Sequence, residues 1–449
     1  MSKQKEFFVP VDPETVYVYV CGITPYDSTH IGHARSYINF DVLIRTLQFL
    51  GHKTVYIRNY TDIDDKLLEK ARAAGNEMGY KEIAEKYIAD FQLQMSRLGC
   101  QSPTVEPRAT EYINEMIAMI GVLLEKGRAY ILGDDVYFDI TTFKEYGKLS
   151  GRNIDELMAG ARIGVDEKKK NPGDFVLWKG NSLGKFWKAP FGYGRPGWHI
   201  ECSAMVDKNC HNRPLDIHGG GYDLIFPHHE NEIAQSESAT GHALASCWIH
   251  NAFVKIGNEK MSKSLGNSLA LDKLFQHTNP MVFRFYVLQH IYLTPLEFCP
   301  ESLVGAQKPF ERLQRLFGQT SVKSQFSISL IKDSEDLDAE QKQFFDQISG
   351  LILDDLNASA VLGLIFKNFE KISSWSQEPK SLLASFIFHV LGLDLWCAPT
   401  EQKNGEFPSE ITELILKRDQ ARKDKDFQLA DQIRAQLKEL GFDVSDKKI

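Results

Sequence analysis

The stretch VYVYVCGITPYDSTHIGHARS, residues 16–36, decides the fold of the amino-terminal part of the chain. Its first five residues alternate valine and tyrosine, a pattern that predicts a short buried strand ending at Cys21. A helix is predicted over about residues 30–50, because Gly51 is a typical left-handed end residue. The run TVYIRN, residues 54–59, predicts the next strand. Strand, helix and strand in this order indicate a βαβ unit, and therefore an α/β fold with a parallel sheet.

This α/β pattern is interrupted and then returns. Residues 66–130 are predicted to be mostly helical, and residues 135–140 are predicted to form a strand. Residues 142–196 are predicted to be loop-rich, since Gly, Pro, Lys and Trp are frequent there. The strand LDIH, residues 215–218, and a helix that ends before Gly241 resume the pattern. The sequence therefore predicts a sheet that is split by an insertion. After about residue 300 the chain is predicted to be almost entirely helical.

The composition is that of an ordinary globular protein, with 43% hydrophobic and 25% charged residues among 449. A formal net charge of −8 does not indicate general binding to nucleic acid, although it allows a local basic face. Seven scattered cysteines indicate a reducing, cytoplasmic location. The most apolar long stretch, residues 381–396, contains His389 and Asp394 and is predicted to be a buried helix. No membrane partner is expected.

Two histidines bracket the start of the first predicted helix. The turn after the first strand lies at the carboxyl end of the sheet, where ligands bind, and a helix start there suits phosphate. His30 and His33 share one helical face, and Gly32 between them leaves room for a flat ring. These residues predict a site for a phosphate and a base. The alternative is that the two histidines only cap or pack the helix start.

A second motif is the polar loop EKMSKSLGNS, residues 259–268. Lys260 and Lys263 are three residues apart, and two serines add hydroxyl groups. Such a loop can fold over a polyphosphate and stabilise the charge that develops as its bonds break. The alternative is a solvated surface loop.

Four scattered residues form a candidate metal set. Cys202 lies in GWHIECSAM, and His228 and Glu232 lie four apart in FPHHENEIAQ, on one face of a predicted helix. With Cys21 at the end of the first strand they provide ligands of the types that zinc prefers. The alternative is that the cysteines are small core residues and that the histidine and glutamate form a surface pair.

HIGH at residues 30–33 and KMSKS at residues 260–264 together resemble the signature pair of the class I aminoacyl-tRNA synthetases. Across the whole chain, longer runs resemble the cysteinyl-tRNA synthetase family: YVCGITPYDSTHIGHARS, RNYTDIDDK, NPGDFVLWK, GRPGWHIECSAM, LDIHGGGYDLIFPHHENEIAQSE, KMSKSLGN and LDDLN. The resemblance implies that ATP activates L-cysteine to cysteinyl-adenylate with release of pyrophosphate. The cysteinyl group is then transferred to the terminal ribose of cysteine tRNA.

The resemblance also implies roles for the motif residues. His30 and His33 are expected to contact the ATP phosphates, and Gly32 is expected to give the adenine its room. Lys260 and especially Lys263 are expected to hold the departing pyrophosphate together with Mg²⁺. His30, His33, Lys260 and Lys263 are therefore the expected catalytic residues.

A zinc ion, one per chain, is implied by the same resemblance. Its ligands are expected to be Cys21, Cys202, His228 and Glu232, and the thiolate of the substrate would complete its shell. Zinc binds thiolate outright, so it can separate cysteine from serine without a separate editing domain.

Four further residues are implied for the amino acid pocket. Thr61, Trp198 and His218 are expected to line it, and Asp223 is a candidate for the substrate amine. The alternatives are that Thr61 belongs to a plain strand end and helix cap, and that Trp198 is a core residue.

The predicted fold class is α/β: a Rossmann-type parallel-sheet catalytic domain split by an insertion, then an all-α helical bundle and a short C-terminal helical arm. A monomer is expected from the family. The predicted division runs as follows: first half of the catalytic domain, 1–100; insertion or connective region, 101–196; second half of the catalytic domain, 197–255; KMSKS-loop linking region, 256–300; helical bundle, 301–398; linker and anticodon-proximal helical arm, 399–449.

The arm contains a basic run, residues 417–425, that is expected to contact tRNA, the alternative being a solvated face. The final residues GFDVSDKKI lack the Gly-Thr-x-Trp-Arg-like ending of many relatives, which concerns the anticodon contacts more than the catalysis.

Two other functions share part of this pattern. One is the ligase of mycothiol synthesis, which joins cysteine to an amino sugar and resembles this chain in its zinc and signature motifs. The other is a non-catalytic RNA-binding relative. The Asn-Glu pair at residues 231–232 and the C-terminal arm favour the synthetase over the first, and the intact HIGH and KMSKS motifs favour it over the second.

Overall fold

The computed structural model describes residues 6–153, 169–256, 259–260 and 269–396, together with 414, 417–418, 420–421 and 426–439. The chain divides into two units, which are described separately. The first unit comprises Met1–Tyr26, Lys53–Ile88 and Pro103–His250, and the second comprises Asp27–His52, Ala89–Ser102 and Asn251–Ile449.

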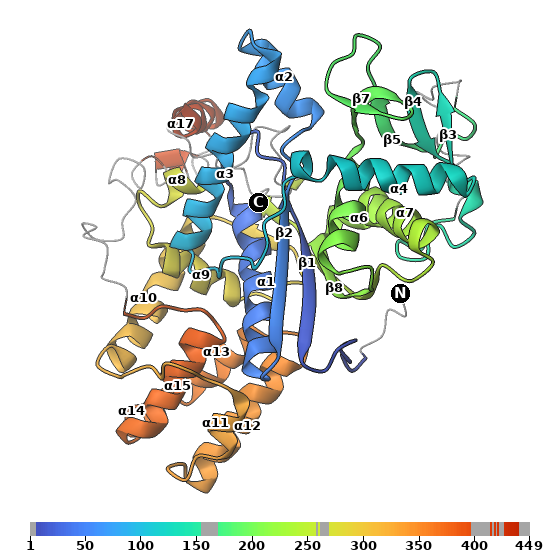
Figure 1. The fold of residues 1–449 in the computed structure, drawn as a ribbon. Coiled ribbons are helices and arrows are strands. Elements are labelled where there is room, and N and C mark those ends of the chain that lie inside the picture. Colours follow the sequence, from blue (N-terminus) through green and yellow to red (C-terminus); the bar gives the residue numbers. More distant parts are fainter. Residues whose placement is uncertain are drawn as a thin grey trace. The chain divides into compact units, whose positions relative to one another are not determined.

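A four-stranded sheet with the order β2-β1-β8-β9 is the centre of the first unit (Figure 1). Strand β1 (Thr15–Ile23) pairs in parallel with β2 (Lys53–Tyr60) and with β8 (Leu215–Gly221), and β9 (Ala245–Asn251) completes the order. The predicted parallel α/β sheet is confirmed. The two inner strands, β1 and β8, are mostly buried because each has a neighbouring strand on both edges and side chains packed on both faces.

Three helices of the first unit lie side by side in Figure 1: α4 (Ile113–Glu125), α6 (Trp198–Asn209) and α7 (Glu230–Thr240). Helix α7 ends at Gly241, whose φ of 85° is left-handed, as the sequence predicts. Two more helices follow β2 in the chain, α2 (Asp65–Ala73) and α3 (Tyr80–Arg97). Short helical turns complete this part, namely η1 (Glu77–Gly79), η2 (Ala109–Glu111), η3 (Ile140–Thr142), η4 (Tyr222–Leu224) and η5 (Ile225–His229).

A separate antiparallel sheet with the order β3-β4-β5-β7-β6 adds to one prediction, because the loop-rich residues 142–196 also contribute strands. Three of its strands fall there, and they are too short to show a clear alternation of polar and apolar residues. Gly194 illustrates the tight pairing, since a Cβ at this position would lie 2.2 Å from the carbonyl oxygen of Lys179. The strands are β3 (Ala129–Leu132), β4 (Asp135–Phe138), β5 (Phe175–Gly180), β6 (Trp187–Ala189) and β7 (Gly192–Pro196).

The second unit contains α1 (Ile31–Phe49), a three-stranded sheet and most of the helices. The sheet has the order β11-β10-β12, formed by β11 (Glu259–Lys260), β10 (Val254–Ile256) and β12 (Leu296–Phe298). The prediction that the chain is helical after residue 300 is confirmed for the described residues. The remaining helices are α8 (Leu271–Leu274), α9 (Pro280–Leu288), α10 (Pro300–Phe317), α11 (Ile328–Lys332), α12 (Ala339–Leu353), α13 (Ala358–Lys367), α14 (Phe369–Ser373), α15 (Gln377–His389) and α17 (Phe427–Glu439).

The apolar stretch 381–396 is mostly buried, as predicted, but its helix α15 ends at His389, before the end of the stretch. Among the described residues, no helix is both long and apolar enough to cross a membrane.

Candidate metal centre and nucleotide-binding turn

The four predicted metal ligands come together in the first unit. Cys21 lies in β1, Cys202 in α6, His228 in η5 and Glu232 in the first turn of α7. One donor atom from each residue lies within 4.8 Å of the donor atoms of the other three. All four residues are buried, so the alternative that the histidine and glutamate form a surface pair is wrong.

Direct contacts link these side chains. His228 Nε2 lies 2.9 Å from Glu232 Oε1, and the thiol of Cys21 donates to the same oxygen at 3.7 Å. The indole of Trp198 stacks on the ring of His228 with a centroid distance of 4.3 Å. The donor side chains are therefore oriented by contacts with one another and by the stacked indole of Trp198.

Burial and mutual contacts shift the pKa values of the four groups in opposite directions: those of Cys21 and His228 rise, and those of Cys202 and Glu232 fall. The hydrogen bond from Cys21 lowers the pKa of Cys202 to about 6, whereas burial raises the pKa of Cys21 well above its usual range. Burial would lower the pKa of His228, but Glu232 and Cys202 raise it to about 10. Burial would likewise raise the pKa of Glu232, yet the neighbouring histidines hold it well below its usual range. The cluster therefore concentrates negative charge at Cys202 and Glu232 in a buried place.

This donor set fits a zinc ion. Ligands at about 2.0 to 2.3 Å from a tetrahedral ion are separated from one another by roughly 3.3 to 3.8 Å, which is below the observed upper limit of 4.8 Å. Two sulfurs, one imidazole nitrogen and one carboxylate oxygen are ligand types that zinc accepts. A divalent cation can also take the place of the proton that the negative groups hold on His228.

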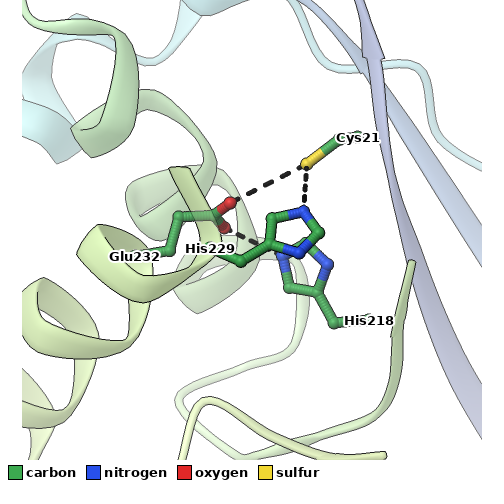
Figure 2. A group of neighbouring side chains, drawn as sticks. All are labelled: Cys21, His218, His229 and Glu232. Atoms are coloured by element: carbon green, nitrogen blue, oxygen red, sulfur yellow. Dashed lines mark hydrogen bonds and ion pairs between the residues drawn. The ribbon is translucent and has the colours of Figure 1, made fainter. Parts of the chain in front are cut away.

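A second set of donors overlaps the first, and Figure 2 shows it: Cys21, His218, His229 and Glu232. His218 Nε2 lies 2.8 Å from Glu232 Oε2, and His229 Nε2 lies 3.4 Å from Cys21 Sγ. His229 Nδ1 in turn lies 2.9 Å from Nε2 of His250. The role of His229 beside the metal set was not predicted, although the doublet at residues 228–229 was the signal that could have indicated it.

The expected pocket residues lie in different surroundings. Thr61 is buried directly after β2, and its backbone N–H donates to the carbonyl of Ile23 at 3.0 Å. Trp198 is 40% exposed at the first position of α6, so the alternative that it is a core residue is wrong. His218 is fully buried in β8, and Asp223 is exposed in η4. The structure thus brings Trp198 and His218 to the metal set through their contacts with its members.

In the second unit, the histidines of the HIGH motif cap their own helix. His30 is the N-cap of α1, and its Nδ1 accepts from the backbone N–H of His33 at 3.3 Å. The N–H of His30 donates to Nδ1 of His33 at the same distance, and the two rings stack with a centroid distance of 3.6 Å. A neutral imidazole that accepts at Nδ1 carries its proton on Nε2. Capping therefore makes both rings Nε2–H donors, so the capping role and a phosphate-binding role are compatible.

The same helix start is joined to the segment after the KMSKS motif. Ile31 donates its N–H to the carbonyl of Leu269 at 3.1 Å, and Leu271 donates to the carbonyl of Thr29 at 2.8 Å. A carboxylate oxygen of Asp90 accepts from both the N–H and the hydroxyl of Thr29. Lys260 lies in β11, but Lys263 and the rest of residues 261–268 lie outside the described residues.

Comparison with known families gives two matches on the chain. Residues 7–308 match the family model for the tRNA synthetases class I (C) catalytic domain. Residues 404–448 match the model for the cysteinyl-tRNA ligase anticodon binding domain.

Two similar relatives are both named cysteine–tRNA ligase. The protein of Syntrophobacter fumaroxidans is 42% identical over 478 residues, which covers 99% of this chain and 96% of that protein. The protein of a Geobacillus species is 43% identical over 453 residues, covering 98% of this chain and 94% of the relative.

Solved structures share the fold at low identity. A Mycobacterium tuberculosis methionyl-tRNA synthetase in complex with methionyl-adenylate matches with a TM-score of 0.57 at 14% identity, covering 84% of this chain and 89% of that chain. A LeuRS of Agrobacterium radiobacter, solved in a ternary complex with tRNA and LeuAMS, matches with a TM-score of 0.58 at 13% identity, covering 88% and 87%. These likenesses support the α/β Rossmann-type assignment.

Proposed function

This chain belongs to the cysteine–tRNA ligase family of class I aminoacyl-tRNA synthetases, and from that premise we propose that it joins L-cysteine to cysteine tRNA in two steps. In the first step, ATP activates the carboxylate of cysteine. In the second step, the cysteinyl group passes to the terminal ribose of the tRNA.

The four residues proposed to hold zinc are Cys21, Cys202, His228 and Glu232. We favour this set over the overlapping one because it contains two thiols rather than one, and zinc binds thiolate strongly. When bound, the ion supplies a position at which a thiolate ligand is favoured and a hydroxyl is not. In the overlapping set, His218 and His229 touch ligands of the proposed set, and such contacts orient ligands.

Selection of cysteine over serine is proposed to depend on this donor set. A hydrophobic pocket without a polar or metal group discriminates against a substrate that carries an added hydroxyl by only about 10²-fold. The ring of Trp198, stacked on His228, would cover the side chain of the substrate on one side. Thr61 and Asp223 are proposed to contact the amino acid, with Asp223 facing the ammonium group.

Adenylate formation is proposed to use the residues of the two signature motifs. The carboxylate oxygen of cysteine attacks the α-phosphorus, a new oxygen–phosphorus bond forms, and the bond to the departing pyrophosphate breaks. His30 and His33 would donate from Nε2–H to phosphate oxygens, while Gly32 leaves space for adenine. Lys260 and Lys263, with Mg²⁺ bound to the phosphates, would neutralise the charge on the pyrophosphate.

The acceptor is proposed to be cysteine tRNA. The match of residues 404–448 to an anticodon binding domain supports tRNA rather than an amino sugar as the acceptor. The amino sugar remains the alternative outcome in the acceptor assay.

One observation supports the metal-dependent reaction more than any other: donor atoms from four buried residues, spread from Cys21 to Glu232, lie within 4.8 Å of one another. The test is the variant Cys202→Ser, in which we expect loss of bound zinc and of cysteine-dependent pyrophosphate exchange. Cys210→Ser is the matched control, because Cys210 is also a buried cysteine and belongs to neither donor set. It is expected to retain one zinc per chain.

Zinc content is measured by elemental analysis, exchange is measured with L-cysteine and L-serine, and transfer is measured with tRNA or the amino sugar as acceptor. Wild-type protein without zinc, or Cys202→Ser protein that keeps one zinc per chain, would contradict the assignment of the ligands. Exchange that is equally fast with serine would contradict the proposed selection.

A further inference from the structure

Arg35 in helix α1 is a buried arginine whose hydrogen-bond acceptors lie far away in the sequence. Its side chain is only 1% exposed. Its Nη1 donates to the carbonyls of Ala252 and Phe253 at 2.9 and 2.6 Å. Arg35 belongs to the same unit as these residues, so the contacts lie within the second unit.

The other terminal nitrogen of Arg35 serves a second segment. Nη2 donates to the carbonyl of Thr294, and it lies 3.3 and 3.4 Å from the carbonyl oxygens of Ile291 and Tyr292. The two segments are also bonded to each other, since the N–H of Ala252 donates to the carbonyl of Tyr292 at 3.0 Å. One guanidinium therefore clamps two adjoining pieces of backbone.

All five of these acceptors are backbone carbonyls, and none of the hydrogen bonds found for Arg35 in the described part of the chain goes to a carboxylate. Burial lowers the pKa of Arg35 to about 10. Burying a guanidinium charge that has no carboxylate partner costs free energy. Hydrogen bonds from the planar guanidinium group to several fixed carbonyl oxygens offset that cost. Lysine cannot reproduce this arrangement, because its ammonium group is compact and lacks the planar fork.

The clamped segments lead directly into the small sheet. Ala252 and Phe253 precede β10, and Thr294 lies two residues before β12. Strand β10 pairs in parallel with β12 and antiparallel with β11, with Lys255 opposite Lys260. Arg35 thus anchors the strands next to the one that carries Lys260.

The chain on the other side of the KMSKS motif is anchored to the same helix. His30 forms an isolated bridge with Ala270, and the backbone bonds of Ile31 to Leu269 and of Leu271 to Thr29 flank it. Arg35 is five residues beyond His30 on α1. Both flanks of the motif are therefore attached within the first turns of the helix that begins with HIGH.

We propose that Arg35 is a positioning residue for adenylate formation, which sets the strands leading to Lys260 at a fixed place along α1, relative to His30 and His33. The inference rests on the proposed function, because the roles of those three residues do. Positioning matters since a displacement of about 1 Å can cost on the order of 10²-fold in rate.

The test compares Arg35→Lys with Arg284→Lys. Arg284 is the control, because it is also fully buried in the second unit and donates to the carbonyls of Leu391 and Leu98; unlike Arg35, it also donates to a carboxylate, that of Asp41. We expect Arg35→Lys to lower kcat of cysteine-dependent pyrophosphate exchange by on the order of 10- to 10²-fold, with KM for cysteine and zinc content unchanged. Arg284→Lys is expected to lower the melting temperature but to retain kcat per folded molecule.

Hydrogen exchange provides a readout that does not depend on activity. In Arg35→Lys we expect faster amide exchange in peptides covering 252–256 and 294–298, and unchanged exchange in α12 and α13. If Arg35→Lys fails to fold by circular dichroism, Arg35→Gln, which keeps one planar pair of N–H donors, is measured in the same way.

Two outcomes separate this inference from the proposed function. An active wild type, together with an Arg35 variant that loses only thermal stability as the Arg284 control does, would overturn the inference alone. A wild type without cysteine-dependent exchange would overturn the proposed function, and this inference with it.

Discussion

At the scale of single residues, the two HIGH histidines cap helix α1 through Nδ1 and can donate to a ligand from Nε2–H. Each ring accepts a backbone N–H at Nδ1, so the pair satisfies two donors that a helix start otherwise leaves without partners. That same contact selects the tautomer with the proton on Nε2. The fold thus prepares His30 and His33 as oriented donors before any ligand arrives.

Because His30 caps α1 and is also proposed to contact phosphate, different substitutions of His30 should change stability and activity separately. The variant His30→Asn keeps an N-cap oxygen, so its stability should stay close to wild type, while loss of the ring should slow adenylate formation by about 10²- to 10³-fold. His30→Ala should be slowed similarly and should also lose about 1 kcal/mol of stability. Pyrophosphate exchange and urea unfolding of both variants check this. Full activity of His30→Asn would mean that His30 acts only as a cap.

At the scale of elements, helix α1 is joined to its surroundings in the second unit by a buried ionic network. The carboxylate of Asp41 accepts from Arg45 on the next turn at 2.6 Å and from Arg284 of α9 at 2.5 Å. Its other oxygen accepts from the N–H of Gln101 at 2.7 Å. Burial would raise the pKa of Asp41, but the two guanidinium groups lower it below its ordinary value. The folded unit therefore favours the ionised carboxylate.

The sign of this shift predicts how stability depends on pH. A carboxylate with a lowered pKa in the folded state stabilises fully above its unfolded pKa of about 3.9, and this contribution is lost as pH falls through the folded value. Asp41→Asn should therefore be less stable than wild type by about 3 kcal/mol at pH 7, because the buried Arg284 and the partly buried Arg45 lose their ionised partner. The difference should shrink as pH falls below about 4.

Urea unfolding at pH 7 and near pH 3 measures this difference, and Asp346→Asn is the control because Asp346 is exposed on α12. A gap between wild type and Asp41→Asn that is the same at both pH values would contradict the ionic role of Asp41.

At the scale of the whole molecule, the chain matches two family models that are separated along the sequence. The catalytic-domain match covers residues 7–308 and the anticodon-domain match covers residues 404–448. All the proposed ATP, zinc and KMSKS residues precede residue 270. Within the basic run 417–425, Arg418 is buried, so the expectation of tRNA contact rests on the other lysines and arginines. The six-part domain division remains a prediction.

Deletion of residues 409–449 should therefore separate the two half-reactions. Cysteine-dependent pyrophosphate exchange should remain close to wild type, while affinity for tRNA should fall. Each lost phosphate contact should also reduce the slope of log affinity against log salt by about 0.7 to 0.9. Filter binding of tRNA at several salt concentrations measures both effects. Identical curves for the two proteins would show that this arm does not contact tRNA.

Much of the architecture and the motif chemistry follows from local sequence. The alternation in residues 16–20, the end of the first helix near Gly51 and the strand at residues 54–59 predict the parallel sheet, because strand and helix periodicities are properties of neighbouring residues. HIGH and KMSKS are equally local, since each is a contiguous run. The strands β5, β6 and β7 of the antiparallel sheet were not predicted for the same reason, because three to six residues carry too little periodicity.

Only the tertiary structure decided which distant residues meet. Cys21 and Glu232 are 211 positions apart and share a hydrogen bond, and no local pattern encodes that distance. Sequence spacing alone left the metal set open, and it did not indicate that His229 would contact Cys21 or that Arg35 would clamp the carbonyls near Phe253. Such contacts depend on how strands and helices pack, because a donor far along the chain reaches its acceptor only after the intervening elements have folded.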